Sequence, residues 1–205
     1  SVDKILVRDT TKAREGIPPE LLIDRWDEIL NDPQIEIVIE VMGGIRPALT
    51  WLEEALRAGK QVVTANKDLL AEYGEQLFDA AEAGKCDLHF EAAVAGAIPI
   101  IRPLRESLVG DEVTAVKGIV NGTTNFILDK MTRQGSSFDE VLAEAQRLGY
   151  AEEDPTADVE GLDAAAKAAI LASLAFHSRV KLDDVDCATK TMPDFPGLWS
   201  ALVGC

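Results

Sequence analysis

Short apolar runs alternate with longer amphipathic stretches over the first half of the chain. The runs predict strands at 4–8, 35–42, 61–64 and 87–94. The stretches between them predict helices at 21–30, 47–58 and 68–83. Gly59 and Gly84 are expected to end the second and third of these helices. Strand–helix–strand units of about 25 residues favour parallel strands joined by crossover helices. The fold class predicted for this part is therefore α/β, with a doubly wound, Rossmann-like sheet.

The pattern changes near residue 100. The elements expected beyond it are a strand at 113–120 and helices at 123–131, 138–148 and 162–177. Thr123 or Thr124 is expected to cap the first of these helices, and Gly149 to end the second. The last helix is apolar on all sides, which is typical of a buried helix. These elements predict a second, α+β domain.

Ligands of a doubly wound sheet lie beyond the carboxyl ends of its strands. The positions that this rule selects are Gly43, Gly44, Ala65, Asn66 and Lys67. Lys67 could hold a phosphate, a carboxylate or a carbonyl oxygen there, or it could be an ordinary surface lysine at a loop.

An acidic segment at 149–167 carries the densest set of ionisable residues. Its acids are Glu152, Glu153, Asp154, Asp158, Glu160 and Asp163. Asp163 and Lys167 are four residues apart, so they share one helix face and can form a pair. A lysine on a buried helix is a candidate for proton transfer. The alternative is a solvated acidic loop followed by a structural ion pair.

A third candidate site lies at 91–99, where a strand runs into a loop of small residues that begins with Glu91. Carbonyl and carboxylate oxygens in such a loop can bind a hard cation. Ordinary packing of the segment is the competing interpretation.

Composition narrows the classes of partner. The chain has 205 residues and a formal charge of −16, so it would repel a nucleic acid backbone. Its longest apolar run, 92–101, is far shorter than the roughly 20 residues of a membrane span. No signal peptide is visible, and three scattered cysteines fit reduced thiols. We expect a soluble cytoplasmic protein with neither a nucleic acid nor a membrane partner.

One feature of a dinucleotide-binding fold is missing from the sequence. Such a fold normally starts with a strand and a G-x-G-x-x-G turn that binds the pyrophosphate. This chain opens instead on a run that resembles the second strand of that unit. We therefore expect a partial nucleotide-binding domain, and a fragment of a longer protein.

The acidic segment resembles the signature of homoserine dehydrogenases. The matching positions are Ala145, Gly149, Tyr150, Ala151, Asp154, Pro155, Asp158, Val159, Gly161, Asp163 and Lys167. The segments 64–67, 91–99 and 121–128 follow the order found in that family. The resemblance covers about residues 1–185 and is absent from 186–205.

The resemblance implies an NADPH- or NADH-dependent reduction of L-aspartate 4-semialdehyde to L-homoserine, on the route to threonine, methionine and isoleucine. It implies that Lys167 protonates the forming alkoxide and that Glu152 binds the amino end of the substrate. Asp158 and Asp163 would orient the substrate and Lys167. Lys67 would lie between nicotinamide and substrate.

Further expectations follow from the same resemblance. Gly43 would contact the cofactor, and Arg8 would meet a 2′-phosphate and so favour NADPH. A sodium ion would bind to oxygens of Glu91, Val94, Gly96 and Ile98.

The implied organisation has three parts. These are a partial NAD(P)-binding domain at 1–100, an incomplete substrate-binding and catalytic domain at 101–185, and a divergent tail at 186–205. The intact protein would be a homodimer or homotetramer with a small-molecule substrate. Two alternatives remain open: an inactive fragment that serves as an oligomerisation or binding module, and a related dehydrogenase for another aldehyde.

Overall fold

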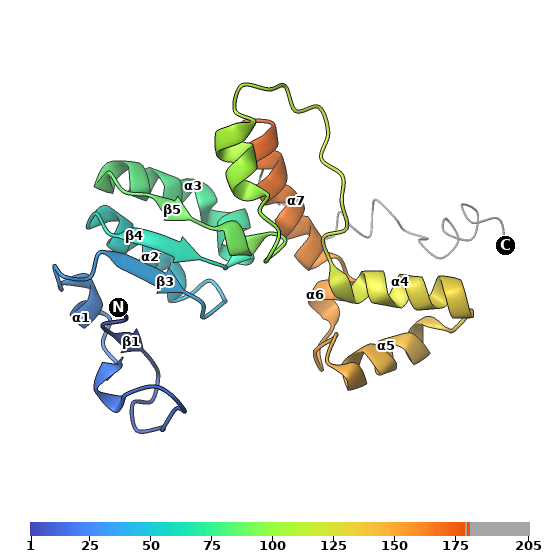
Figure 1. Cartoon of the computed structure of the whole chain (residues 1–205), viewed down its shortest axis with the longest axis horizontal. Coiled ribbons are helices and arrows are strands. Elements are labelled where there is room, and N and C mark those ends of the chain that lie inside the picture. Colours follow the sequence, from blue (N-terminus) through green and yellow to red (C-terminus); the bar gives the residue numbers. More distant parts are fainter. Residues whose placement is uncertain (179, 181–205) are drawn as a thin grey trace. The chain divides into compact units, whose positions relative to one another are not determined.

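The computed structural model describes residues 1–178 and 180, which form two compact units, Ser1–Ala93 and a second that begins at Val94 (Figure 1). The predicted tail at 186–205 lies outside the described residues. The strands of the first unit are β1 (Ile5–Leu6), β2 (Leu22–Ile23), β3 (Ile37–Glu40), β4 (Gln61–Thr64) and β5 (Leu88–His89). Its α-helices are α1 (Asp27–Leu30), α2 (Ala48–Arg57) and α3 (Lys67–Gly84), and it has 3-10 turns at Pro19–Leu21 and Glu91–Ala93.

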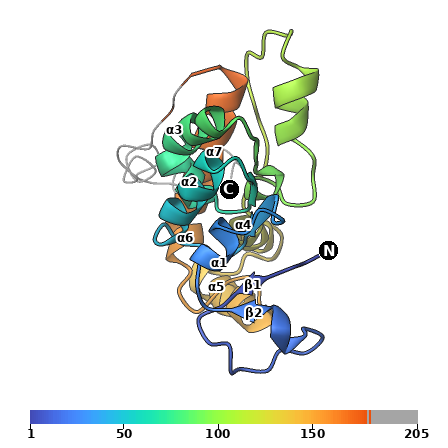
Figure 2. The same cartoon turned by 90° about the vertical axis from the view of Figure 1, so that its left-hand side faces the viewer.

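All strand pairs are parallel, as the sequence predicts. β3, β4 and β5 form one sheet in that order, with Val38 opposite Val62 and Val62 opposite Leu88. β1 and β2 form a separate parallel pair (Figure 2), with Ile5 opposite Leu22 and Leu6 opposite Ile23. Helix α2 connects β3 to β4 and helix α3 connects β4 to β5. The arrangement is the α/β fold of repeated strand–helix units.

One face of the three-stranded sheet is buried. Val38, Val62 and Leu88 lie on this face, and the strands contact α2 and α3, which also pack against each other. The alternate residues of β3, Ile37 and Ile39, point the other way and are 56% and 67% exposed. Alternation of the side chains along β3 therefore separates the core from an uncovered face.

Gly84 lies in the last turn of α3 rather than after its end, which corrects the predicted boundary. The residue that ends the helix in the left-handed conformation is Lys85, with φ of 56°. A Cβ atom on Gly84 would lie 1.8 Å from the carbonyl oxygen of Leu56 in α2. Glycine is required here because the two helices approach closely.

The second unit is helical where it is regular. Its α-helices are α4 (Gly122–Gln134), α5 (Phe138–Leu148), α6 (Thr156–Val159) and α7 (Leu162–Ala175), and a π-helical turn covers Pro103–Ser107. Helix α5 has the predicted bounds, because a capping box of Ser137 and Glu140 starts it and Gly149 ends it with φ of 78°. Helix α4 is capped by Asn121, not by the predicted Thr123 or Thr124.

Three predicted elements differ from the structure. Residues 113–120 are not a strand, because no described segment pairs with them, and Val116 and Ile119 are exposed. The helix predicted at 21–30 is instead a 3-10 turn, strand β2 and the short α1, because Leu22 and Ile23 pair with β1. The strand predicted at 87–94 is limited to β5 and is followed by a 3-10 turn.

Candidate active site

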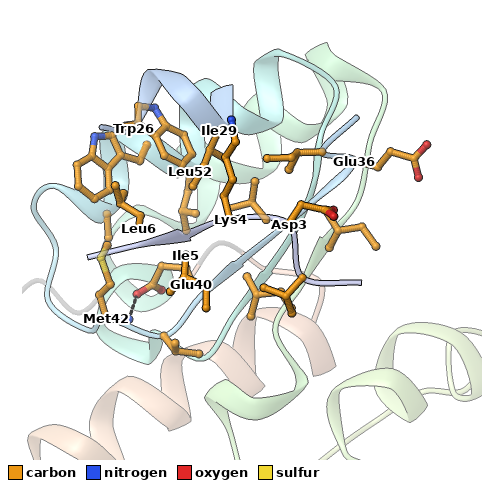
Figure 3. Close-up of a pocket in the computed structure, with 18 of the residues that line it drawn as sticks. Asp3, Lys4, Ile5, Leu6, Trp26, Ile29, Glu36, Glu40, Met42 and Leu52 are labelled. Atoms are coloured by element: carbon orange, nitrogen blue, oxygen red, sulfur yellow. Dashed lines mark hydrogen bonds between the residues drawn. The ribbon is translucent and has the colours of Figure 1, made fainter. Parts of the chain in front are cut away.

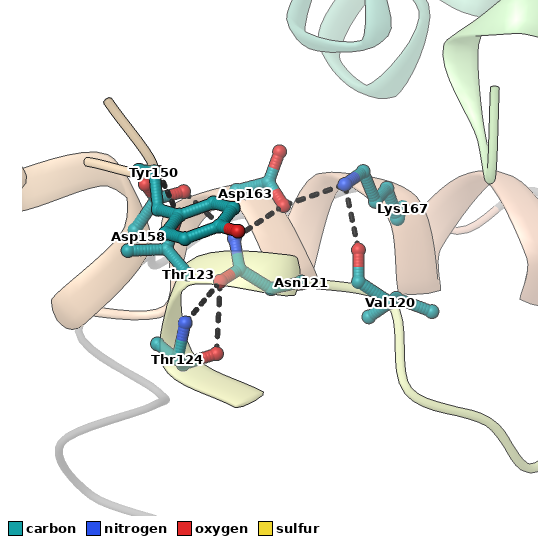
Figure 4. Close-up of polar contacts among 8 residues, drawn as sticks. All are labelled: Val120, Asn121, Thr123, Thr124, Tyr150, Asp158, Asp163 and Lys167. Atoms are coloured by element: carbon teal, nitrogen blue, oxygen red, sulfur yellow. Dashed lines mark hydrogen bonds and ion pairs between the residues drawn. The ribbon is translucent and has the colours of Figure 1, made fainter. Parts of the chain in front are cut away.

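Asp163 and Lys167 form a partly buried ion pair on α7 (Figure 4). The Lys167 Nζ lies 2.7 Å from Asp163 Oδ2, and it also donates to the Val120 carbonyl at 2.7 Å. The Lys167 side chain is 17% exposed and the Asp163 side chain is 9% exposed. The pair expected from the four-residue spacing is therefore present. An ammonium has three N–H groups, and these two bonds use two of them.

The local sequence explains why α7 presents this pair. Gly161 precedes the helix in the left-handed conformation, with φ of 80°, and Asp163 lies in the first turn. A carboxylate is favourable at a helix N-terminus, and its partner one turn later lies on the same face. Most of the other residues of α7 are alanine or larger apolar residues. The pair thus supplies the charged residues of a mostly apolar helix.

Asn121 connects this pair to a second carboxylate. Its side-chain Nδ2 donates to Asp158 Oδ1 at 2.7 Å and to Asp163 Oδ2 at 2.9 Å. Its Oδ1 accepts from the backbone N–H and the hydroxyl of Thr124, both at 2.8 Å. Helices α4, α6 and α7 therefore meet through one side chain. From the sequence, Asn121 is only the first residue of the family-like segment 121–128, and nothing in the local pattern indicates this bridge.

The acidic loop after α5 is held by its backbone. The Gln146 amide donates to the Glu152 and Glu153 carbonyls, each at 3.2 Å, and the Thr123 hydroxyl donates to the Tyr150 carbonyl at 2.7 Å. Glu152 itself is exposed. The structure therefore fixes the loop without joining the Glu152 carboxylate to the ion pair.

Asp154 stabilises the far end of the same loop. The hydroxyl and the backbone N–H of Thr156 donate to its Oδ1 at 2.6 and 3.1 Å. These bonds favour the ionised carboxylate, so they hold the pKa of Asp154 below its ordinary value, with the hydroxyl bond as the larger cause.

A second polar network lies at the carboxyl ends of β3 and β4 in the first unit. Glu40, which is only 4% exposed, accepts from the backbone N–H groups of Met42 and Gly43 at 2.6 and 3.0 Å. It also accepts from the Thr64 hydroxyl at 2.6 Å. Sequence analysis missed Glu40, although an acid at the buried end of an apolar strand is a signal for such a role.

Asn66 connects this network to Lys67. The Asn66 side chain caps α3 by accepting from the Leu69 N–H at 3.2 Å, and it donates to the Gly44 carbonyl at 2.6 Å. Lys67 is the first residue of α3. The positions selected by the strand-end rule, around Gly44 and Asn66, are therefore brought together.

Two of the predicted cofactor contacts, Gly43 and Arg8, are exposed. Gly43 has φ of 72°, and a Cβ atom there would meet nothing within 4 Å, so a ligand has room to approach. Its N–H is already bonded to Glu40, which leaves its open face rather than its amide for a ligand. Arg8 is exposed, just beyond β1.

The predicted sodium ligands are divided between the two units. Glu91 belongs to the 3-10 turn at the end of the first unit, and Val94, Gly96 and Ile98 belong to the second. Val94 is buried and Ile98 is exposed, with Ile98 donating to the Ala95 carbonyl at 2.8 Å. Within the described residues, no group of three or more histidine, cysteine or acidic side chains could hold a metal.

A cavity of about 630 Å³ lies in the first unit, between β1 and β3 (Figure 3). These strands are not hydrogen-bonded to one another. Its walls include Ile5, Leu6 and Ile39, with Trp26 at one side. None of the site residues predicted from the sequence lines it, but Glu40 and Met42 do, so the cavity adjoins the polar network at the end of β3.

Comparison with known proteins decides the family. A family model for the homoserine dehydrogenase NAD-binding domain matches residues 1–91, and the homoserine dehydrogenase model itself matches residues 99–192. The chain belongs to the homoserine dehydrogenase family. Its first unit is accordingly an NAD-binding domain of Rossmann-like fold. Across the described residues, no helix is long and apolar enough to cross a membrane.

Relatives from the same family agree with this chain in sequence and structure. The homoserine dehydrogenase of Corynebacterium glutamicum is 59% identical over 183 residues, which cover 89% of this chain and 41% of the relative. That of Bacillus subtilis is 53% identical, with 90% and 43% covered. The crystal structure of a homoserine dehydrogenase from Thiobacillus denitrificans has a TM-score of 0.80 and 48% identity, with 87% and 42% covered. The chain thus spans less than half the length of these relatives.

Proposed function

We propose that this chain carries the proton-donating lysine of a homoserine dehydrogenase, Lys167, and part of its nucleotide-binding sheet. The reaction is the NAD(P)H-dependent reduction of L-aspartate 4-semialdehyde to L-homoserine, a step toward threonine, methionine and isoleucine. The observation that carries the proposal is the Lys167 ammonium, held by Asp163 and the Val120 carbonyl at 2.7 Å each. Its remaining N–H is the group that reaches the substrate oxygen.

Reduction of an aldehyde places negative charge on its oxygen. A bound nicotinamide supplies the hydride for this reaction. The Lys167 ammonium stabilises the developing alkoxide more than the neutral carbonyl, and its proton completes the alcohol. Asp163 keeps the ammonium in place during this step. The second partner of Lys167, the Val120 carbonyl, restricts the lysine side chain further.

The acidic loop suits the amino end of the substrate. The exposed Glu152 carboxylate is assigned to the substrate ammonium, and Asp158 to its orientation. The substrate ammonium carries the same charge in the ground state and in the transition state of the reaction. Their contribution is therefore to substrate binding rather than to the chemical step.

The polar network of Glu40, Thr64 and Asn66 at the carboxyl ends of β3 and β4 suits the cofactor. Glu40 and Asn66 fix the loops that carry Gly43 and Lys67, and the open face of Gly43 leaves room for a flat ring. Lys67 is assigned to cofactor binding and to polarisation of the carbonyl. Arg8 is assigned to the 2′-phosphate, which favours NADPH.

One structural relative supports this choice of cofactor. A hyperthermophilic archaeal homoserine dehydrogenase in complex with NADPH has a TM-score of 0.70 and 34% identity to this chain.

The proposal extends to an ion, an assembly and a location. A sodium ion is assigned to oxygens of Glu91, Val94, Gly96 and Ile98, because carboxylate and carbonyl oxygens are ligands for hard cations. The active assembly is a homodimer or homotetramer in the cytoplasm.

The test is turnover. The chain, restored at both ends to the length of its relatives, is purified and mixed with aspartate semialdehyde and NADPH, and oxidation of the reduced nicotinamide is followed by absorbance. We expect homoserine to form and Glu152→Ala to raise the KM for the aldehyde with little change in kcat. A chain that forms oligomers but neither binds NADPH nor turns over would favour the alternative, a non-catalytic oligomerisation module.

A further inference from the structure

We propose that Asn121 is a positioning residue that holds Asp163, and through it the Lys167 ammonium, in the geometry of proton donation. This inference rests on the proposed function. The sequence signature in α6 and α7 does not include Asn121, which lies 42 residues before Asp163. Its assignment comes from the contacts of its side chain alone (Figure 4).

The orientation of the Asn121 amide is fixed by its neighbours. On one side is the backbone N–H of Thr124, which can only donate, so the atom facing it is the oxygen. On the other side are Asp158 and Asp163, whose ionised oxygens can only accept, so the atom facing them is the nitrogen. The amide uses both N–H groups and both lone pairs, and the residue is 8% exposed. It therefore has one stable orientation.

This orientation restrains the ion pair. Asp163 Oδ2 accepts from Asn121 at 2.9 Å and from Lys167 at 2.7 Å, so the same oxygen is held from two directions. Without the amide, Asp163 Oδ2 loses one of these two donors, and the ammonium that it holds is less restrained. The amide also lies between two carboxylates that would otherwise repel each other. Its position thus controls where the ammonium points.

Helix capping does not require this bridge. A cap needs only a side-chain oxygen, and Ser137 provides one for α5. Asn121→Ser therefore keeps the cap of α4 and removes the amide that reaches the two carboxylates. Asn125→Ser is the matched control, because Asn125 is exposed on the same helix. Asp163→Asn is the positive control, because it removes the charge that Lys167 pairs with.

The experiment measures how readily each lysine is acylated. The full chain and the three variants are treated briefly with acetic anhydride, and modification of Lys167 is quantified by mass spectrometry. Lys130 is the internal reference, since it is 23% exposed and pairs with Glu144 at 2.6 Å. We expect Asn121→Ser and Asp163→Asn to raise the Lys167-to-Lys130 ratio about 10-fold, the scale of one charged hydrogen bond. Asn125→Ser should leave the ratio unchanged.

Selectivity separates positioning from stability. A merely structural role would lower the melting temperature and expose both lysines alike, whereas loss of positioning changes Lys167 alone. An unchanged ratio in Asn121→Ser would overturn the proposal, whether or not Asp163→Asn changes it.

A kinetic arm links this inference to the reaction. In the turnover assay, Asn121→Ser should lower kcat about 10-fold to 100-fold, with the KM for NADPH unchanged. Absence of turnover in the unaltered chain would refute the proposed function, while the acylation ratio would still decide the role of Asn121. Unaltered kcat in an active Asn121→Ser variant would overturn the positioning role.

Discussion

Replacing Gly84 by alanine should destabilise the first unit strongly, because of the contact between α2 and α3. The new Cβ would lie 1.8 Å from the Leu56 carbonyl oxygen, 2.9 Å from the Leu56 carbonyl carbon and 3.3 Å from the Gly59 nitrogen. All three obstacles are backbone atoms, so no side chain can rotate to make room. The helices must instead move apart by roughly 1 Å in a close-packed interior.

The magnitude follows from two opposing terms. Alanine favours a helix interior over glycine by about 1 kcal/mol. Overpacking of a rigid site costs about 1–3 kcal/mol and sometimes more, and here it also separates the buried leucines Leu52, Leu56 and Leu77. With the overpacking cost at the upper end of its range, we expect the free energy of unfolding to fall by about 2 kcal/mol, a large part of the usual 5–15 kcal/mol.

Gly74 provides a matched control on the same helix. A Cβ atom there would meet only Phe78 Cε2, at 3.9 Å, which is ordinary contact. Gly74→Ala should therefore raise the free energy of unfolding by about 0.5–1 kcal/mol, through helix propensity and the reduced freedom of the unfolded chain. The same substitution thus has opposite signs at two positions of α3.

Urea unfolding measures both effects. The stacked pair Trp26 and Trp51, with ring centroids 5.5 Å apart, reports on the first unit by its fluorescence. A Trp199→Phe background removes the third tryptophan of the chain. Gly84→Ala should lower the urea midpoint by about 1–2 M. A Gly84→Ala variant as stable as Gly74→Ala would refute the close approach of the two helices.

Three further substitutions test the site residues. Lys167→Ala should lower kcat at least about 100-fold with little change in the KM for the aldehyde, as expected for a general acid. A lower melting temperature with unchanged kcat would instead show that Lys167 is only a structural partner of Asp163. Thr156→Val removes the hydroxyl bond to Asp154, so an NMR titration should show its pKa rise toward the ordinary value. Ionised Asp154 stabilises the folded state at any pH above the pKa that it has in the unfolded chain, and this stability is lost as the pH falls through its lower pKa in the folded protein. In Thr156→Val the same loss should occur at a higher pH. Glu40→Ala removes the acceptor of the buried Thr64 hydroxyl and of the Met42 and Gly43 N–H groups, so calorimetry should show a loss of about 3 kcal/mol. The matched control Glu36→Ala, at an exposed position of the same segment, should have almost no effect.

Local signals predict much of the fold. Strand β4 and helix α5 have their predicted bounds, because alternating burial defines the first and a capping box with Gly149 defines the second. Parallel pairing also follows from the spacing of strands and helices. These features depend on residues within a few positions of each other. A sequence displays such short-range relations directly.

Elements that depend on distant partners are not predicted. The segment 113–120 is rich in β-branched residues, as strands are, but a strand exists only where another segment accepts its hydrogen bonds. Leu22 and Ile23 fit a helical pattern, yet their pairing with β1 makes them a strand. Gly84 resembles a helix end, and only the position of Leu56 shows why glycine is needed. In each case a long-range contact overrides the local preference.

The candidate site divides in the same way. The pair of Asp163 and Lys167 follows from a spacing of four residues, and the sequence predicts it. Two other partners of that pair, the Val120 carbonyl and the Asn121 amide, come from 47 and 42 residues away. An asparagine that caps a helix is common, and only the packing of α4 against α6 and α7 places its amide between two carboxylates. The charge of the site is therefore encoded locally, while the direction in which the ammonium points depends on the tertiary fold.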